Sequence, residues 1–299
     1  MHAPVLLAEV VDSLRVKPGS SVIDCTMNGG GHAIALLKKI MPGGKLLGIE
    51  YDPEIFNLFC QKINEPEYKW ALDGIVPVND SYRNIEVIAL KHGFLHPEGI
   101  LFDFGISSFH VDSADRGFTF QKDQALDMRF SHFDRVITAA SILNDYPEND
   151  LADIFYFFGE ERFSRSIAHQ IVQARRGSAI RTTFQLNDII RRAVPAWYTR
   201  SRIHFATKVY QALRIAVNEE LTVISEGIQK AFAILPVGGR IAAISFHSLE
   251  DRIIKQAFKS FVLMGSATLV SRKAIVASRE EIIHNPRARS AKLRVIEKI

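Results

Sequence analysis

SVIDCTMNGGGHAIALLKKIMPGGKLLGIEYD, from Ser21 to Asp52, is the stretch of sequence that decides the fold. A short apolar run ends in Asp24, a glycine triplet follows at 29–31, and the pattern predicts a helix that starts near His32. A second apolar run, LLGI, ends in Glu50. Strand, glycine turn, helix, strand and terminal acid form the βαβ layout of a nucleoside-cofactor site. We therefore expect Glu50 to accept hydrogen bonds from two ribose hydroxyls.

The glycine pattern indicates which cofactor fits. A dinucleotide site uses G-x-G-x-x-G, because the pyrophosphate must lie on the helix N-terminus. This chain has N-G-G-G-H instead, and Asp24 at the end of the first strand suits a cationic amino-acid group. S-adenosylmethionine carries such a group and no phosphate. A glycine turn that serves only tight strand–helix packing is the alternative, and the position of Glu50 favours the cofactor.

Composition limits the class of protein. The chain has 299 residues, 47% of them hydrophobic and 23% charged, as in a soluble globular protein. Its two cysteines, Cys25 and Cys60, form no CxxC pair, and no apolar run reaches the roughly 18 residues of a membrane span. We expect a cytoplasmic protein with no membrane partner. Gly93 and Pro97 interrupt the helix that could pair His92 with His96, so no metal site is expected.

Positive charge is concentrated in the second half of the chain. Residues 160–214 contain eleven Lys or Arg and three Asp or Glu, although the whole chain carries only +4. Aromatic residues lie among the basic ones, a combination that suits a phosphate backbone with unstacked bases. A solvated helical face is an equally good reading of charge alone. A further basic cluster in the C-terminal segment favours nucleic acid; it comprises Arg287, Arg289, Lys292 and Arg294.

The order of predicted elements indicates an α/β fold with an insertion. Helices are expected at 53–63 and 82–91, and strands at 74–78 and 99–103. The strand–helix alternation then stops; helical periodicity covers 150–173 and 184–194, and one long helix is predicted over 206–235. A strand at 240–246, a helix from Ser248 and two closing strands, at 267–270 and 293–296, complete the pattern. We expect a discontinuous cofactor domain, 1–110 with 208–299, and an inserted basic helical subdomain, 111–207, that recognises RNA.

Motifs along the whole chain carry a family resemblance. They are HAPVLLAEVVDSL, DCTMNGGGHA, FDFGISSFHVD, RGFTF, LDMRF, GEERFSRSIA, ATKVYQALRIAVNEEL, ISFHSLEDRIIK and NPRARSAKLR. In order and spacing they resemble the ribosomal RNA small subunit methyltransferase H family, which methylates N4 of a cytosine in the decoding region of 16S ribosomal RNA. The resemblance implies a Rossmann-like S-adenosylmethionine-dependent methyltransferase fold with an inserted helical subdomain. It also implies a ribosomal RNA partner, within the assembled or assembling small subunit, although the sequence leaves naked RNA open as the substrate. A homodimer also stays open.

The resemblance also assigns roles to individual residues. It places cofactor contacts at Gly31, His32, Ala33, Glu50, Tyr82, Asp103 and His110. From the residues alone, we favour a core position for Tyr82 and a surface position in a turn for His110, and a functional role for Glu50 and Asp103. The chain departs from the family pattern with Asn28 for a glycine, Ala33 for a serine or threonine, Glu50 for an aspartate, and Phe109-His110 for Pro-Gln.

The catalytic assignment follows from the target atom. A cytosine amine is a poor nucleophile, so the site needs a hydrogen-bond acceptor for it, and we assign that role to Asp103. Secondary candidates are Ser107, Ser108, Asp127, Arg129 and His247, with Phe118 and Phe120 as platforms for the base. Three other classes compete: an NAD-dependent oxidoreductase, which the glycine pattern disfavours; a noncatalytic RNA-binding protein; and a methyltransferase of small molecules or proteins, which the basic insertion disfavours.

Overall fold

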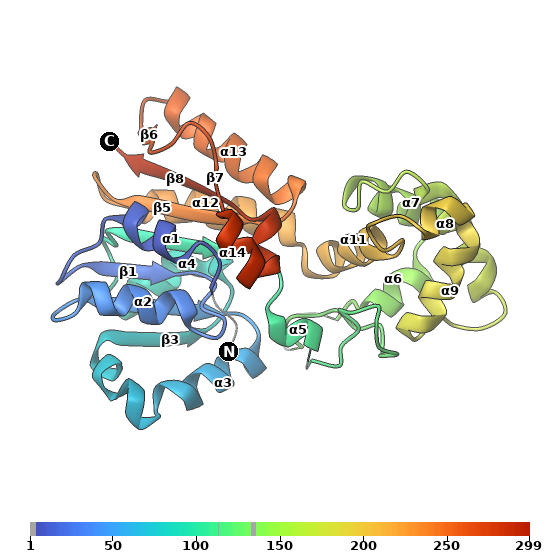
Figure 1. Cartoon of the computed structure of the whole chain (residues 1–299), viewed down its shortest axis with the longest axis horizontal. Coiled ribbons are helices and arrows are strands. Elements are labelled where there is room, and N and C mark those ends of the chain that lie inside the picture. Colours follow the sequence, from blue (N-terminus) through green and yellow to red (C-terminus); the bar gives the residue numbers. More distant parts are fainter. Residues whose placement is uncertain (1–3, 113, 133–135) are drawn as a thin grey trace. The chain divides into compact units, whose positions relative to one another are not determined.

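A computed structural model describes residues 4–112, 114–132 and 136–299. The chain divides into two compact units (Figure 1). The first unit combines Met1–Gly105 with Leu221–Ile299, and the second unit is the continuous segment Ile106–Glu220.

The first unit is built on one mixed sheet. Its strands are β1 (Ser21–Asp24), β2 (Lys45–Glu50), β3 (Ile75–Asn79), β4 (Gly99–Asp103), β5 (Arg240–Ser245), β6 (Ala267–Leu269), β7 (Ile275–Val276) and β8 (Lys292–Lys298). Among the described residues the order is β3-β2-β1-β4-β5-β8-β6, with β7 paired to β8. The first five strands are parallel, and β8 is antiparallel to β5 and to β6. The chain order reverses direction between β1 and β4, where a parallel sheet opens its ligand crevice.

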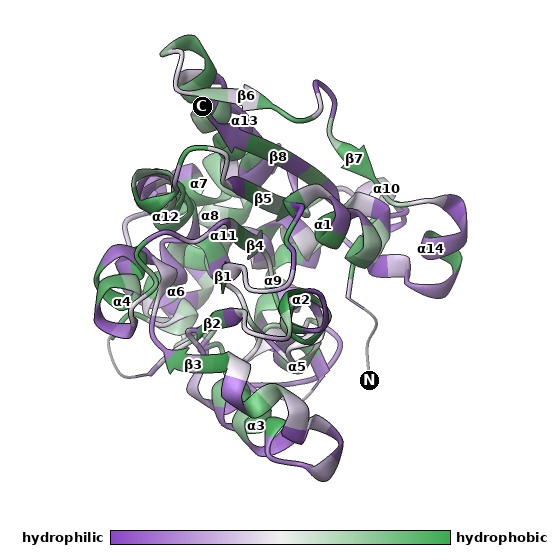
Figure 2. Cartoon of the chain, turned by 90° about the vertical axis from the view of Figure 1, so that its left-hand side faces the viewer, coloured by the Kyte–Doolittle hydropathy of each residue, from purple (hydrophilic) through white to green (hydrophobic). Residues whose placement is uncertain are grey.

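Helices cover both faces of this sheet. Neighbouring strand residues such as Val22 and Ile23 point into different hydrophobic clusters, because side chains alternate along a strand. On one face lie α1 (Leu7–Leu14), α2 (Gly31–Ile40), α3 (Pro53–Ile63), η1 (Pro66–Gly74), α14 (Arg279–His284) and η3 (Pro286–Ser290). On the other lie η2 (Tyr82–Asn84), α4 (Ile85–His92), α12 (Glu220–Ile234) and α13 (Ser248–Leu263). The strands are mostly hydrophobic, as their colour in Figure 2 shows, which is the pattern of a sheet buried on both faces.

The second unit is helical and has its own core. Its helices are α5 (Ser108–Asp112), α6 (Ala139–Asp145), α7 (Glu148–Phe157), α8 (Ser164–Arg175), α9 (Thr183–Ala193), α10 (Ala196–Thr199) and α11 (Thr207–Asn218). Leu143, Phe155, Ile167 and Leu213 are fully buried in one cluster. Capping boxes fix the starts of α6 and α9, where the side chain of Thr138 or Thr182 accepts a hydrogen bond from a backbone N–H of the first turn.

The prediction of one long helix over 206–235 is wrong, because the chain breaks between α11 and α12. Glu219 takes a left-handed φ of 49° and ends α11. Asn218 before it is buried, and its amide donates to the carbonyls of Met128 and Arg214. These contacts hold the end of α11 in the second unit, which spans Ile106–Glu220. From the sequence we expected the inserted subdomain to span 111–207. In the described part of the chain, no helix is both long and apolar enough to cross a membrane.

Gly117, in the RGFTF motif, tests the packing of the second unit. It has φ +77°, and a Cβ there would lie 2.4 Å from the carbonyl oxygen of Ala125. We expect Gly117→Ala to lower the free energy of unfolding by about 1–3 kcal/mol, measured by urea denaturation. Gly177→Ala is the matched control, because its Cβ would meet nothing closer than 3.7 Å. Equal midpoints for the two variants would contradict this reading.

Candidate cofactor site

Two aspartates mark the carboxyl ends of the adjacent strands β1 and β4. Asp24 is 1% exposed, and its Oδ1 accepts a hydrogen bond from the backbone N–H of Thr26 at 3.1 Å. The hydroxyl oxygen of Thr26 in turn accepts the backbone N–H of Asp103 at 2.6 Å. Asp24 Oδ2 and Asp103 Oδ1 are buried and have no hydrogen-bond partner. Buried carboxylate oxygens without a hydrogen-bond partner are costly, so these two are candidate contacts for a ligand.

The glycine loop between β1 and α2 has the tight backbone that the sequence predicts. Asn28 has φ 47° and Gly30 has φ 78°, both in the left-handed region. A Cβ on Gly30 would lie 2.2 Å from the ring of Phe59, so no other residue fits there. Asparagine tolerates this backbone better than most residues, which explains how Asn28 replaces the expected glycine.

Glu50, at the end of β2, holds this loop. Its Oε2 accepts the backbone N–H of Asn28 and its Oε1 accepts that of Asp52, both at 2.8 Å. A carboxylate has about four acceptor positions, so two remain for a ligand. Burial raises the pKa of Glu50 to about 7, although these two hydrogen bonds oppose the shift.

His32 lies between the loop and Asp103. Its Nε2 is 3.0 Å from the carbonyl oxygen of Val5, and its Nδ1 is 3.5 Å from Asp103 Oδ2. A carbonyl only accepts hydrogen bonds, so Nε2 carries the proton and Nδ1 faces Asp103. Burial lowers the pKa of His32 below its usual value. Burial therefore favours the neutral form of the imidazole over the cation.

Asp103 is the acid with the most unusual surroundings. Burial first, and then the charge of Glu250, raise its pKa to about 7. Glu250 is itself fully buried, where its Oε2 accepts the backbone N–H of Phe246 at 2.7 Å. Burial raises the pKa of Asp24 to about 6, and the charge of the nearby Asp103 contributes to that shift. A cluster of buried acids favours a ligand with a positive group.

The other predicted cofactor contacts of the first unit differ in how deeply they are buried. Gly31 opens α2 and packs against Pro4, whereas Ala33 is fully buried in the core. Tyr82 is half-buried, with its ring centroid 5.5 Å from that of Phe102 and 5.9 Å from that of Phe104.

His110 belongs to the second unit, where it is 5% exposed. Its Nδ1 accepts the backbone N–H of Ser107, and its ring centroid lies 5.0 and 4.8 Å from those of Phe118 and Phe130. The expectation of a surface residue at this position is wrong, because the ring packs in an aromatic cluster.

The secondary candidates have mainly structural contacts. Asp127 and Arg129 pair with each other, with Nη2 and Oδ2 2.7 Å apart. His247 caps α13, and the side chain of Ser108 is outside the described residues. Phe118 is 7% exposed, and the ring of Phe120 stacks on that of His204 with centroids 4.2 Å apart.

Two residues of the cluster escaped prediction from sequence. Thr26 connects the ends of β1 and β4, and Glu250 supplies a buried charge near Asp103. Glu250 is the third residue of α13, where an acid is a recognisable capping signal in the sequence. The strand that its charge faces cannot be read from the sequence, because it depends on the order of the strands in the sheet.

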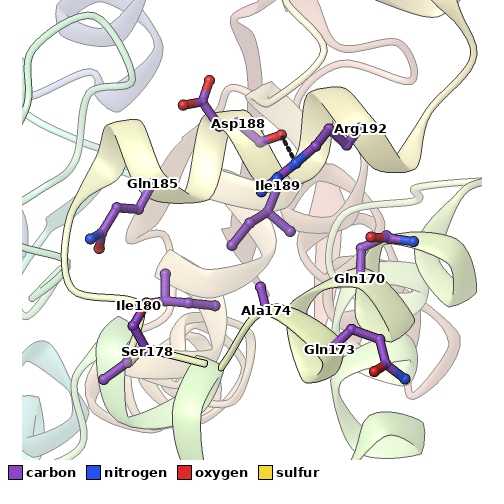
Figure 3. A pocket seen from close by; sticks show the side chains of 10 residues that line it. Gln170, Gln173, Ala174, Ser178, Ile180, Gln185, Asp188, Ile189 and Arg192 are labelled. Atoms are coloured by element: carbon purple, nitrogen blue, oxygen red, sulfur yellow. Dashed lines mark hydrogen bonds between the residues drawn. The ribbon is translucent and has the colours of Figure 1, made fainter. Parts of the chain in front are cut away.

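A groove of about 500 Å³ lies within the second unit, between α8 and α9 (Figure 3). Its floor includes Ala174, Ile180 and Ile189, and its walls carry Gln170, Gln173, Gln185 and Arg192. It has no cluster of acids, so it differs in chemistry from the site on the first unit.

Comparison with known proteins supplies the context for this geometry. The model of the MraW methylase family matches residues 1–299. A ribosomal RNA small subunit methyltransferase H of Dehalococcoides mccartyi is 41% identical over all of this chain and 86% of its own length. The protein of the same name from Dictyoglomus thermophilum is 40% identical over all of this chain and 97% of its own. A solved rRNA methylase from Streptococcus thermophilus is 11% identical with a TM-score of 0.43, covering 98% of this chain and 92% of that one.

Asp24→Asn tests the buried acids through the pH dependence of stability. The Asp24 pKa is about 6 in the folded chain against an ordinary 3.8, so ionisation at rising pH costs more in the folded state than in the unfolded state. The free energy of unfolding of the wild type therefore falls as the pH rises from about 4 to about 6. We expect the variant to gain up to about 3 kcal/mol relative to wild type over that interval, since each pKa unit is worth about 1.4 kcal/mol. Urea unfolding at pH 4.5 and pH 7 measures the difference, and a pH-independent difference would contradict the assignment.

Proposed function

The chain belongs to the MraW methylase family, and on that premise we propose that it methylates small-subunit ribosomal RNA at N4 of a cytosine in the decoding region. S-adenosylmethionine is its cofactor, which when bound supplies a methyl group on a positively charged sulfur. The observation that carries the proposal is the pair of buried, unpartnered carboxylate oxygens on Asp24 and Asp103. They fit the cationic amino-acid end of this cofactor.

Each part of the cofactor has candidate partners in the first unit. Asp24 and Asp103 would hold the ammonium group, and Glu50 would accept the ribose hydroxyls with the acceptor positions that Asn28 and Asp52 leave unused. Gly31 and His32 would border the cofactor along the loop. Ala33 lies behind them in the core and would act by fixing the loop.

Two aromatic positions complete the proposed cofactor site. Tyr82 would border the adenine, because its ring is only half-buried beside Phe102 and Phe104. His110, from the second unit, stays a proposed polar contact.

Asp103 is our proposed catalytic residue. The amine of cytosine donates its lone pair to the ring, so it needs an acceptor that draws electron density back onto nitrogen. Asp103 would accept an N–H hydrogen bond from the amine and take that proton as the N–C bond forms and the bond between the methyl carbon and the cofactor sulfur breaks.

The second unit would bind the RNA. Eight of its basic side chains between 160 and 214 are exposed: Arg162, Arg165, Arg176, Arg181, Arg191, Arg192, Arg200 and Arg202. Exposed cations bind phosphates by releasing counterions, so affinity should fall steeply with salt. We propose that the substrate is the RNA of the assembled or assembling small subunit, which places the enzyme in the cytoplasm. A homodimer stays a prediction.

Glu50→Gln tests the ribose contact. The amide keeps one acceptor oxygen, so one loop N–H or one ribose hydroxyl loses its partner together with the charge. We expect the affinity for S-adenosylmethionine to fall about 10- to 100-fold by calorimetry. Glu54→Gln, at an exposed position in the first turn of α3, is the control. Equal affinity of the two variants would exclude the ribose contact.

Asp103→Ala tests the acceptor. We expect a native fold and a kcat at least about 100-fold lower at saturating cofactor, because general-base catalysis is lost. The measurement is the transfer of a labelled methyl group to small-subunit ribosomal RNA, followed by mapping of the methylated atom. Asp73→Ala, at an exposed position of the same unit, is the control. Full activity of the Asp103 variant would rule out its role.

A further inference from the structure

Trp197 is a large aromatic side chain of the second unit that is exposed among basic residues. Trp197, on the short helix α10, is 56% exposed, whereas Tyr198 beside it is 9% exposed. An indole that is more than half exposed leaves apolar area that a partner can bury.

The indole is held in place on several sides. The guanidinium of Arg162 lies 4.4 Å from its ring centroid, a cation–π distance. Phe163 and Tyr198 contact it with their ring planes tilted, at centroid distances of 6.0 and 5.8 Å. The hydroxyl of Tyr198 donates to the fully buried Glu161 at 2.5 Å, which anchors the group in the core. The surface is therefore preorganised.

The charge around the indole is positive. Arg165 follows Arg162 by three residues, and Arg200 and Arg202 follow α10 directly; all four are exposed. In the part of the chain that the structure describes, neither Arg165, Arg200 nor Arg202 has an ion pair or a hydrogen bond from its side chain. These cations are available to an anionic partner.

A second exposed aromatic pair provides the contrast. Tyr156 and Phe157, on α7, are 57% and 60% exposed, so exposure alone does not distinguish them from Trp197. The helix α7 carries Glu148, Asp150 and Asp153 and no Lys or Arg. The charge of the surroundings therefore separates the two aromatic sites.

We propose that Trp197 and Arg162 form a stacking platform for an unpaired nucleotide of the substrate RNA, with Arg165, Arg200 and Arg202 binding the adjoining phosphates. The inference rests on the proposed function and names the part of the second unit that contacts RNA. Bases stack on aromatic and guanidinium planes whatever their identity. The platform supplies affinity that is largely independent of sequence, and specificity stays with the catalytic site.

The test measures binding of a single-stranded oligonucleotide of small-subunit ribosomal RNA by fluorescence anisotropy. We expect Trp197→Ala to weaken binding about 5- to 100-fold and Trp197→Phe to retain most of the affinity, because stacking needs a ring. Phe157→Ala, the matched control, should bind like the wild type. Equal affinity of Trp197→Ala and wild type would overturn the proposal.

Two further readouts separate stacking from charge. The chain has two tryptophans, so in a Trp70→Phe background the emission of Trp197 alone should be quenched by RNA. The double variant Arg200→Gln/Arg202→Gln should reduce the slope of log affinity against log salt by about 1.4, whereas Trp197→Ala should leave it unchanged. Absence of quenching would overturn the platform.

The outcome for the platform is distinguishable from that for the proposed function. Cofactor affinity should be unchanged in every Trp197 variant, and each variant should still unfold cooperatively. If the wild type methylates ribosomal RNA but Trp197→Ala loses no affinity, only the platform is wrong. If the wild type transfers no methyl group to ribosomal RNA, the proposed function itself is wrong.

Discussion

Keeping carboxyl groups out of water at one edge of a parallel sheet is the constraint on which the first unit depends. Asp24, Glu50 and Asp103 end three neighbouring strands, and burial raises the pKa of each. Their hydrogen bonds also shape the backbone, because Glu50 holds the glycine loop and Thr26 connects β1 to β4. The same groups thus shape the loop and gather three buried acids at one edge of the sheet.

Much of this edge can be predicted from sequence, because an acid directly after an apolar run marks a strand end. The helix predicted at 53–63 coincides with α3, where Pro53 follows an Asp52 cap. The break at Glu219 could not be predicted, since it depends on contacts of Asn218 with residues far away in the chain. The pairing of His32 with Val5 and Asp103 likewise requires the folded arrangement.

The second unit shows what a count of charged residues can predict and what it cannot. Composition identifies a basic segment but does not separate side chains that face water from those used internally. Arg175 donates to the carbonyl of Leu143 and Arg214 pairs with Glu220, so neither is an exposed cation. Only the fold distinguishes them from Arg200 and Arg202. The sequence therefore predicts a basic segment, and the structure shows which of its basic side chains are exposed.

The place of β8 has a consequence for how the molecule is assembled during synthesis. This strand lies between β5 and β6, yet it follows both in the chain. The sheet must therefore keep a gap at that point, with β6 unable to join, until residues 292–298 have left the ribosome. The second unit is one continuous segment and can finish folding earlier. Its helices would then be in place while the cofactor-binding sheet is still incomplete.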